Sequence, residues 1–361
     1  MMQFESDGKV YNPLGGGSYV YQDSLIQYLH SQLRKNVVKI SIGAQPNSSP
    51  HFGTLEVFCL AFSLANMLKK YDNDLEISVL FEMVDTAPAI AKMVNNNKYQ
   101  ISLRDSGEMD KYIDQYYEIL GQLSKLSGIS YEVRGQRDFN KHYGIPDIVK
   151  KIIDNREVLA PILEPKKQIL RIRAACPICG LTDKQGIENT FVGNEMICLC
   201  PEHGKFKVDI YQESYRLEYN TPLRNLIRGL VYLTDNEDTN TAYQWLRITG
   251  ADYAGFYQEQ LLYKTTDLLG YNVSKLPMIL YAPLVTDWSG AKLSKSLYVK
   301  EGAYKYLPSF MINYDNLRKE KGVSGLARIY AEVHSWLEEP YKLFRNYSIY
   351  YFMEVLKWQI L

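Results

Sequence analysis

Two apolar segments on either side of a helix-like segment constrain this fold more than any other feature of the chain. VVKISIGA, residues 37–44, and LEISVLFEMV, residues 75–84, have the continuous apolar composition of strands that are buried on both faces. Between them, the loop 45–53 leads into a periodic apolar segment over 54–70, which predicts a helix. Strand, loop, helix and strand make a βαβ unit. We therefore expect an α/β protein built on a Rossmann-type parallel sheet.

Further segments predict additions to this core. Apolar periodicity indicates helices near residues 109–128, 145–159 and 222–233. The segments 129–135 and 278–285 have the composition of strands.

The charge balance argues against one broad class of function. Lys plus Arg and Asp plus Glu each number 41, whereas a protein that coats nucleic acid is usually basic. A local basic patch is compatible with this balance. Residues 1–17 are polar and Gly-rich, without the apolar core of a secretory leader, and no apolar stretch reaches the length of a membrane span. We therefore expect a cytoplasmic protein that does not enter a membrane.

Four of the five cysteines are clustered in one short part of the chain and have the spacing of a metal site. The candidate ligands are Cys176, Cys179, Cys200 and His203, in a C-x-x-C pair followed by a C-x-x-H pair. Four such sulfur and nitrogen ligands suit tetrahedral Zn²⁺ in a closed, structural site. Cys198 is a possible substitute for Cys200. The cluster predicts a zinc ribbon in a reducing compartment rather than a disulfide framework.

These patterns divide the chain into segments. We predict a Rossmann catalytic core from residues 1–87 and 211–300, a mainly helical insertion over 88–170, a zinc ribbon over 171–210 and a C-terminal helical segment over 301–361.

The loop before the first helix is a candidate phosphate site. In a parallel sheet this loop lies at the carboxyl end of a strand, where ligands bind, and the helix N-terminus offers free N–H groups and a partial positive charge. His51 can donate a hydrogen bond to a phosphate oxygen, and Gly53 lets a flat base approach the backbone. Taken alone, His51 also fits a surface histidine in a turn.

Two later segments have related chemistry. The loop over 286–296 (TDWSGAKLSKS) carries Lys292 and Lys295, which can neutralise charge on a triphosphate and on leaving pyrophosphate. A solvated lysine loop is the alternative. Asp252, two residues after Gly250, can accept hydrogen bonds from both hydroxyls of a ribose, or it can cap a helix.

Together, the two loops resemble the signature motifs of class I aminoacyl-tRNA synthetases. PHFGT, residues 50–54, resembles the HIGH motif, and KLSKS, residues 292–296, resembles the KMSKS motif. The resemblance implies a HUP-like nucleotidyl transferase core that binds ATP with Mg²⁺. Thr54 replaces the second histidine of HIGH and keeps one hydrogen-bond donor. The implied catalytic residues are His51, Lys292 and Lys295, and the implied ATP contacts are Pro50, Gly53, Thr54, Gly250, Asp252, Ser294 and Ser296.

Candidates for the amino-acid site lie at the ends of the predicted strands and near them. They are Gly43, Ala44, Gln45, Glu82, Asp85, Trp245 and Tyr253. Glu82 or Asp85 can pair with a basic substrate or with the α-amino group, and each also fits a carboxylate that is satisfied at a strand end.

The order of the segments is most similar to the catalytic half of class I lysyl-tRNA synthetases, over roughly residues 20–300. The part after KLSKS is shorter than the anticodon-binding domain of that family. We therefore expect ATP-dependent activation of an amino acid as its adenylate, with transfer to a small-molecule amine or a minimal tRNA acceptor. Two alternatives stay open: a compact synthetase that charges tRNA through the acceptor stem, and a non-catalytic regulator that binds ATP or an amino acid.

Overall fold

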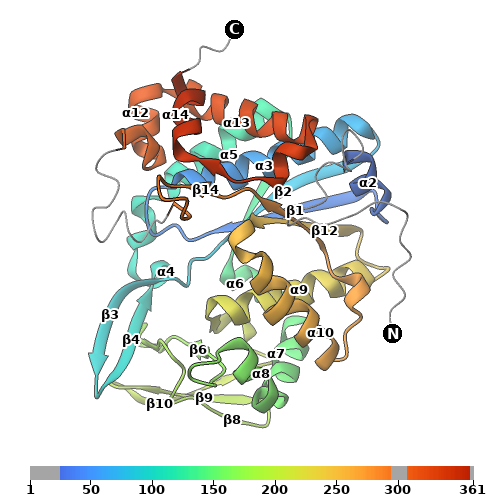
Figure 1. Cartoon of the computed structure of the whole chain (residues 1–361). Coiled ribbons are helices and arrows are strands. Elements are labelled where there is room, and N and C mark those ends of the chain that lie inside the picture. Colours follow the sequence, from blue (N-terminus) through green and yellow to red (C-terminus); the bar gives the residue numbers. More distant parts are fainter. Residues whose placement is uncertain (1–24, 294–306, 358–361) are drawn as a thin grey trace.

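The computed structural model describes residues 25–293 and 307–357, and its centre is a five-stranded parallel sheet (Figure 1). In spatial order the strands are β13 (Met278–Ala282), β12 (Tyr243–Gly250), β1 (Val37–Ala44), β2 (Glu76–Met83) and β5 (Ser130–Gly135). β1 pairs in parallel with both β2 and β12, so the chain adds strands first on one side of β1 and then on the other. This is the predicted Rossmann-type arrangement, and its topological switch point lies between β1 and β12.

The predicted strands agree with the observed ones except at two places. The prediction for β1 is confirmed residue for residue. The predicted strand 278–285 ends earlier, at Ala282, because Pro283 has no N–H to donate to a strand ladder. β5 lies inside the range 88–170 that we assigned to a helical insertion, yet it forms one edge of the central sheet.

Alternate strand residues face opposite sides of the sheet, and each side has its own helical layer. Ile248 of β12 packs into the core on the α3 side, whereas Trp245 of the same strand packs on the α9 side. The first layer contains α2 (Leu25–Ser31), α3 (Phe52–Tyr71) and α5 (Ile113–Ser127). The second contains α6 (Gln136–Phe139), α7 (Ile145–Asp154), α8 (Arg156–Leu163), α9 (Thr221–Glu237), the π-helix η5 (Phe256–Tyr263) and α10 (Lys264–Leu268). The sheet therefore separates two cores.

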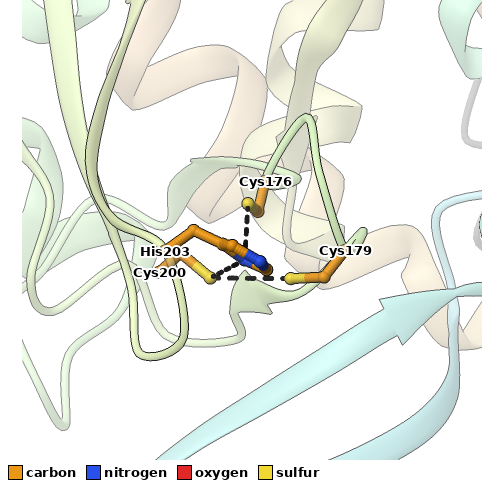
Figure 2. A group of neighbouring side chains, drawn as sticks. All are labelled: Cys176, Cys179, Cys200 and His203. Carbon is orange, nitrogen blue, oxygen red and sulfur yellow. Dashed lines mark hydrogen bonds between the residues drawn. The ribbon is translucent and has the colours of Figure 1, made fainter.

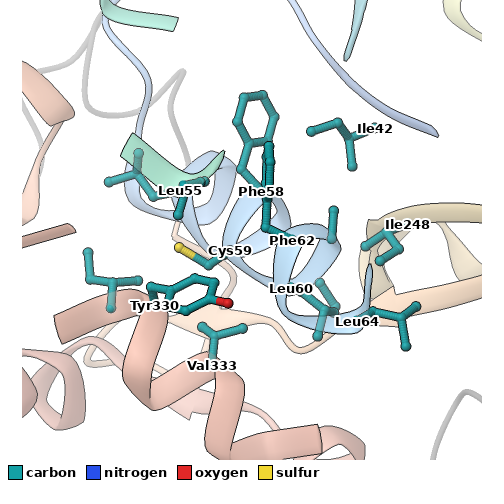
Figure 3. Packing of buried hydrophobic residues seen from close by; sticks show 14 of the residues in the cluster. Ile42, Leu55, Phe58, Cys59, Leu60, Phe62, Leu64, Ile248, Tyr330 and Val333 are labelled. Carbon is teal, nitrogen blue, oxygen red and sulfur yellow. The ribbon is translucent and has the colours of Figure 1, made fainter. Parts of the chain in front are cut away.

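The helix α3 is the one helix in the described part of the chain that is long and apolar enough to cross a membrane by length and composition. Our expectation that no segment reaches that length was therefore wrong. Within the protein, 67% of its apolar window is buried. Figure 3 shows Phe58 and Phe62 of α3 near Ile42 and Ile248 of the sheet. The apolar composition of α3 is thus explained by its place between the sheet and a further helical layer outside it.

That outer layer is formed by the C-terminal helices, which lie across α3 (Figure 1). They are α12 (Tyr314–Lys321), α13 (Val323–Glu338) and α14 (Ile349–Lys357), and a short strand β15 (Tyr347–Ser348) pairs in parallel with β14 (Val285–Thr286). Tyr330 and Val333 of α13 face Cys59 and Leu60 of α3 (Figure 3). Residues 301–361, predicted as a helical segment, are therefore part of the same core where the structure describes them.

The insertion begins with a β-hairpin that the sequence analysis did not predict. Strands β3 (Pro88–Val94) and β4 (Asn97–Ser102) are antiparallel, and the turn residues Asn95 and Asn96 have φ angles of 47° and 62°. Two adjacent residues with positive φ define a tight hairpin turn, for which asparagine is well suited. After the hairpin comes the short helix α4 (Leu103–Ser106), which the side chain of Ser102 caps.

The hairpin continues into the cysteine-rich segment, because β4 pairs with β7. The strands of this segment and the one that follows it are β6 (Ile172–Ala174), β7 (Thr182–Asp183), β8 (Thr190–Val192), β9 (Glu195–Cys200), β10 (Gly204–Asp209) and β11 (Leu217–Tyr219). β8, β9 and β10 form an antiparallel sheet, beside the hairpin and away from the central sheet (Figure 1).

Candidate functional site

A cavity of about 340 Å³ opens at the switch point of the central sheet. Gly43 and Ala44 at the end of β1, and Thr249 and Gly250 at the end of β12, contribute to its wall. Parallel sheets bind ligands at this place because the loops on either side diverge there. The cavity also brings together predicted residues from three distant segments, namely His51, Gly53, Thr54, Gly250, Asp252, Tyr253 and Lys292.

One wall of the cavity is the N-terminus of α3. His51 is the N-cap residue, in an extended conformation and without a side-chain capping bond, so its ring does not occupy the helix N–H groups. Gly53 and Thr54, in the first turn, line the cavity beside it. Pro50 does not line the cavity. Its carbonyl oxygen accepts a hydrogen bond from the Tyr314 N–H, at 2.8 Å, so it connects this loop to α12.

The lining of the cavity also contains an ion pair between two residues that we predicted for different parts of a nucleotide. Lys292 Nζ donates to Asp252 Oδ2. A Cβ atom at Gly250 would lie 2.5 Å from Asp252 Oδ1, so glycine is needed there for the carboxylate to fold back over the strand end. Lys292 is held by a turn in which Thr286 and Lys292 form a β-bridge. A group that binds here must therefore exchange contacts with this pair.

The predicted residues Ser294, Lys295 and Ser296 lie outside the described residues.

Glu56 is a cavity residue that the sequence analysis missed. It lies on α3 and is 2% exposed, and among the described residues its Oε1 has no hydrogen-bond partner. Burial, and secondly the Asp252 carboxylate, raise the pKa of Glu56 well above its ordinary value, whereas Lys292 lowers it. These surroundings therefore favour the neutral form of the Glu56 carboxyl group. The sequence could have indicated Glu56 as a site residue by its position two residues after Thr54, on the side of the helix that faces the strand end.

Replacing Glu56 by glutamine is expected to stabilise the protein increasingly as pH rises. A carboxyl group whose pKa is raised in the folded state contributes stability that is complete below its unfolded pKa and is lost as pH rises through the folded pKa. The amide of Glu56→Gln cannot ionise, so it avoids this loss. Urea unfolding of both proteins at several pH values from mildly acidic to mildly alkaline measures the difference. Glu157→Gln, at an exposed position, is the control, and a Glu56→Gln difference independent of pH would contradict the assignment.

A cluster of arginines forms the inner end of the cavity, on the α9 side of the sheet. Arg224 and Arg228 of α9 and Arg247 of β12 are all at most 7% exposed and all line the cavity. Arg247 donates to Tyr257 Oη at 3.2 Å and to Ser41 Oγ at 2.8 Å. The sequence analysis did not single out these arginines, although two of them lie four residues apart on one helix face.

Among the predicted amino-acid residues, Gly43, Ala44, Gln45 and Tyr253 line the cavity, whereas Glu82, Asp85 and Trp245 do not. Glu82 forms an ion pair with Arg134 and accepts a hydrogen bond from Tyr232 Oη at 2.8 Å. Burial acts to raise the pKa of Glu82, but Arg134 and Arg228 lower it below its ordinary value. The carboxylate of Glu82 is therefore satisfied by neighbouring protein groups at the strand end, which is the second of our two interpretations of this residue.

Asp85 and Trp245 also have structural partners. Asp85 accepts a hydrogen bond from the Gln136 N–H at 3.3 Å. The Trp245 indole N–H donates to Asp235 at 2.7 Å, and its ring stacks on Tyr232 with the centroids 4.3 Å apart. Trp245 belongs to the core on the α9 side of the sheet.

The cysteine cluster forms a compact group of potential metal ligands (Figure 2). The ligand atoms of Cys176, Cys179, Cys200 and His203 all lie within 4.8 Å of one another. Cys176 Sγ and Cys200 Sγ are 3.7 and 3.6 Å from His203 Nδ1, and Cys179 Sγ is 3.5 Å from Cys200 Sγ. Ligands at about 2.0–2.3 Å from a tetrahedral Zn²⁺ lie roughly 3.5–3.8 Å apart. The donor set and its spacing therefore fit a zinc ion.

Cys198 is not part of this group, which corrects its assignment as a substitute ligand. It is 3% exposed and packs in the core on the α9 side of the sheet. Burial raises the pKa of its thiol to about 12, which keeps it protonated. Cys198 and Cys200 point to the same side of β9 because they are two residues apart. Cys198 nevertheless packs in the larger core, whereas Cys200 lies with the other ligands.

The fold and cavity together define an α/β protein with a ligand site at the switch point of a Rossmann-type sheet. No family model and no curated protein matches the chain. Solved structures of aminoacyl-tRNA synthetases are similar to it in part. A putative arginyl-tRNA synthetase from Campylobacter jejuni has a TM-score of 0.40 at 10% identity, over 85% of this chain and 68% of that chain. Methionyl-tRNA synthetase from Mycobacterium tuberculosis, in complex with methionyl-adenylate, has a TM-score of 0.44 at 10% identity, over 88% and 67%.

A glutamate-tRNA synthetase from Elizabethkingia anophelis has a TM-score of 0.33 at 12% identity, over 73% of this chain and 54% of that chain. The chain thus spans about half the length of the glutamate enzyme. At similarities of this size we base the function on the residues of the cavity.

Proposed function

We propose that the protein activates the carboxylate of an amino acid with ATP, forming an aminoacyl-adenylate and releasing pyrophosphate. The observation that supports this most is the convergence of three segments, distant in the sequence, on one cavity. The N-terminus of α3, the carboxylate of Asp252 and the ammonium of Lys292 all line it. These are the groups that the chemistry of a nucleoside triphosphate needs: donors for phosphate, an acceptor for ribose hydroxyls and a cation for the leaving group.

The reaction joins a carboxylate oxygen of the amino acid to the α-phosphorus of ATP. The bond from the α-phosphorus to the oxygen that bridges to the β-phosphate breaks, and pyrophosphate leaves. Mg²⁺ bound to the phosphates would supply further neutralising charge. The N-terminus of α3 and His51 line the part of the cavity that we assign to the reacting phosphate, where negative charge increases in the transition state. Lys292 leaves Asp252 to neutralise charge on pyrophosphate, and Asp252 then accepts the ribose hydroxyls.

The test is exchange of labelled pyrophosphate into ATP, which requires the adenylate to form reversibly. We expect exchange that depends on an added amino acid, measured for each of the twenty amino acids with and without bulk tRNA. Absence of exchange with every amino acid under both conditions would contradict the proposed enzyme and favour a regulator that only binds.

The acceptor is read in a second assay. Purified protein, ATP and the active amino acid are incubated with bulk tRNA or with small amines, and labelled RNA is compared with labelled amide. We propose an amine or a minimal tRNA as the acceptor, and charging of full-length tRNA alone would favour the compact synthetase instead.

A further inference from the structure

The inner end of the cavity holds more buried positive charge than the described part of the chain neutralises. Arg224, Arg228 and Arg247 line it, and the carboxylate that pairs with any of them is Glu82, whose oxygen is 3.8 Å from Arg228 Nη2. Glu82 is already paired with Arg134. Among the side chains that the structure describes, neither Arg224 nor Arg247 forms an ion pair.

Arg224 is the clearest case. Its guanidinium contacts two neutral groups, the Tyr219 carbonyl oxygen at 3.4 Å and Thr221 Oγ1 at 3.2 Å, and its Nε has no partner among the described residues. Burial, and secondly the charge of Arg228, lower the pKa of Arg224 to about 9, so the group is still a cation at neutral pH. A buried cation without an anionic partner is costly, and binding of an anion offsets that cost.

The guanidiniums converge beside the end of β1. A Cβ atom built at Gly43 would lie 3.6 Å from both Arg228 Nη1 and Arg247 Nη2. The absence of a side chain at Gly43 therefore leaves room for the two arginines to meet at the strand end. Planar, forked guanidiniums in this arrangement match a carboxylate well.

This cluster lies on the other side of the sheet from the candidate nucleotide residues. Leu246 and Ile248 of β12 face the core that contains α3, whereas Arg247, between them, faces α9. In Figure 1, α3 and α9 lie on opposite sides of the central strands. A triphosphate held at the N-terminus of α3 and at Lys292 therefore leaves the arginine end of the cavity to another part of the bound substrates.

We propose that the amino-acid substrate is a dicarboxylic one, of the aspartate or glutamate class. One carboxylate reacts with ATP beside α3, and the second, on the side chain, is bound by the arginine cluster, in which Arg224 and Arg247 lack an anionic partner among the described side chains. This inference rests on the proposed function, because it assigns the substrate of the same site. It differs from the basic substrate with which Glu82 or Asp85 could have paired, because the Glu82 carboxylate is taken up by Arg134 and Arg228.

The first test compares isosteric pairs on the wild-type protein. Pyrophosphate exchange is measured with L-aspartate, L-asparagine, L-glutamate, L-glutamine and L-lysine, with and without bulk tRNA. We expect an acidic amino acid to exceed its own amide by about 10²-fold or more in kcat/KM, because a site built for one charged group rejects the analogue that lacks it. Exchange with a neutral or basic amino acid in preference would overturn the dicarboxylic assignment and leave activation in place.

If no amino acid supports exchange, the proposed function fails, and calorimetry then decides the inference separately. Wild-type protein is titrated with L-aspartate and L-glutamate and with their amides. Tighter binding of an acidic form than of its amide supports an anion site at the arginines, and equal or absent binding of all four overturns it.

The second test removes one cation. Arg224→Gln is expected to lower the acid-to-amide selectivity by about 10²-fold, since truncating one partner of a buried charge pair has effects of this size. Arg173→Gln is the matched control, because Arg173 is equally buried but pairs with Glu218 and does not line the cavity. Arg224→Lys keeps the charge if the glutamine variant does not fold, and it should retain preference for the acid. Unchanged selectivity in Arg224→Gln would overturn the assignment.

Discussion

Removing the zinc that we propose for the cysteine cluster is expected to unfold the ligand-bearing end of residues 171–210, and Cys200→Ser is expected to have nearly the same effect. The end of this segment that carries the ligands packs around one small buried cluster, which consists of Tyr99 of the hairpin with Cys176, Leu181 and Cys200. Two of those four residues are metal ligands in our assignment. Structural zinc contributes about 10 kcal/mol or more to the folding of small domains of this kind. The strands of the segment also pack into the core on the α9 side of the sheet through Met196, Val208 and Ile210, so the loss should be confined to the end that carries the ligands. The measurement is metal content together with proteolysis of the segment, before and after chelation.

The chain offers a matched control for this experiment. Cys198 lies on the same strand as Cys200 but outside the ligand group, and its thiol is buried and protonated. Cys198→Ala should therefore keep its full zinc content. A protein purified without metal that still resists protease at 171–210, or a Cys200→Ser variant with undiminished zinc, would contradict the structural role.

Loss of the metal should also loosen the neighbouring hairpin. β4 pairs with β7, and Lys92 of β3 forms an ion pair with Glu202, between the ligands Cys200 and His203. Exposed ion pairs contribute little on their own, so the hairpin relies on the ordered ribbon. Hydrogen exchange of residues 88–102 should rise on chelation, while that of the central sheet stays unchanged.

The central sheet could be predicted from the sequence because its signal is local. A run such as VVKISIGA is apolar throughout, and only strands covered on both faces have that composition. The hairpin was missed because β3 is mostly exposed and its composition is mixed. Its two turn residues, Asn95 and Asn96, were the available evidence.

The candidate site was predictable in part for a different reason. Loops at strand ends are found by position, and the resemblance of two of them to paired motifs grouped His51, Gly53, Asp252 and Lys292 as candidates for one site. All four line the cavity. Which neighbour satisfies a polar side chain is a long-range property. Glu82 meets Arg134 from an adjacent strand and Tyr232 from α9, and no short segment of sequence contains that information.

The arginines illustrate the same limit on a helix. Arg224 and Arg228 fall on one face of α9, where charged residues normally meet water. Here that face meets the cavity, because α9 is buried nearly all round. A polar helix face alone does not distinguish solvent from a binding site, whereas the position of α9 beside the ends of β1 and β12 does.

Replacing Lys292 by alanine is expected to lower kcat/KM for adenylate formation roughly 30- to 1000-fold. This corresponds to a loss of about 2–4 kcal/mol of transition-state stabilisation, because a cation that acts on the leaving group is lost. We expect a loss of the same size for Lys295→Ala, in the same motif. Pyrophosphate exchange is the assay. Lys319→Ala is the control, since Lys319 is exposed on α12 and pairs with Asp315.

The ion pair with Asp252 makes a sharper version of this experiment possible. If Lys292 served only to hold Asp252, then Asp252→Asn and Lys292→Ala would remove the same interaction, and the double variant would be no worse than either single one. If the two residues act on different parts of ATP, as we propose, the ammonium on pyrophosphate and the carboxylate on ribose contribute separately. The losses in the double variant should then nearly add. The exchange rates of the two single variants are also expected to depend differently on salt concentration, because we assign only Lys292 to the charged leaving group. Unchanged exchange in Lys292→Ala would remove this lysine from the site.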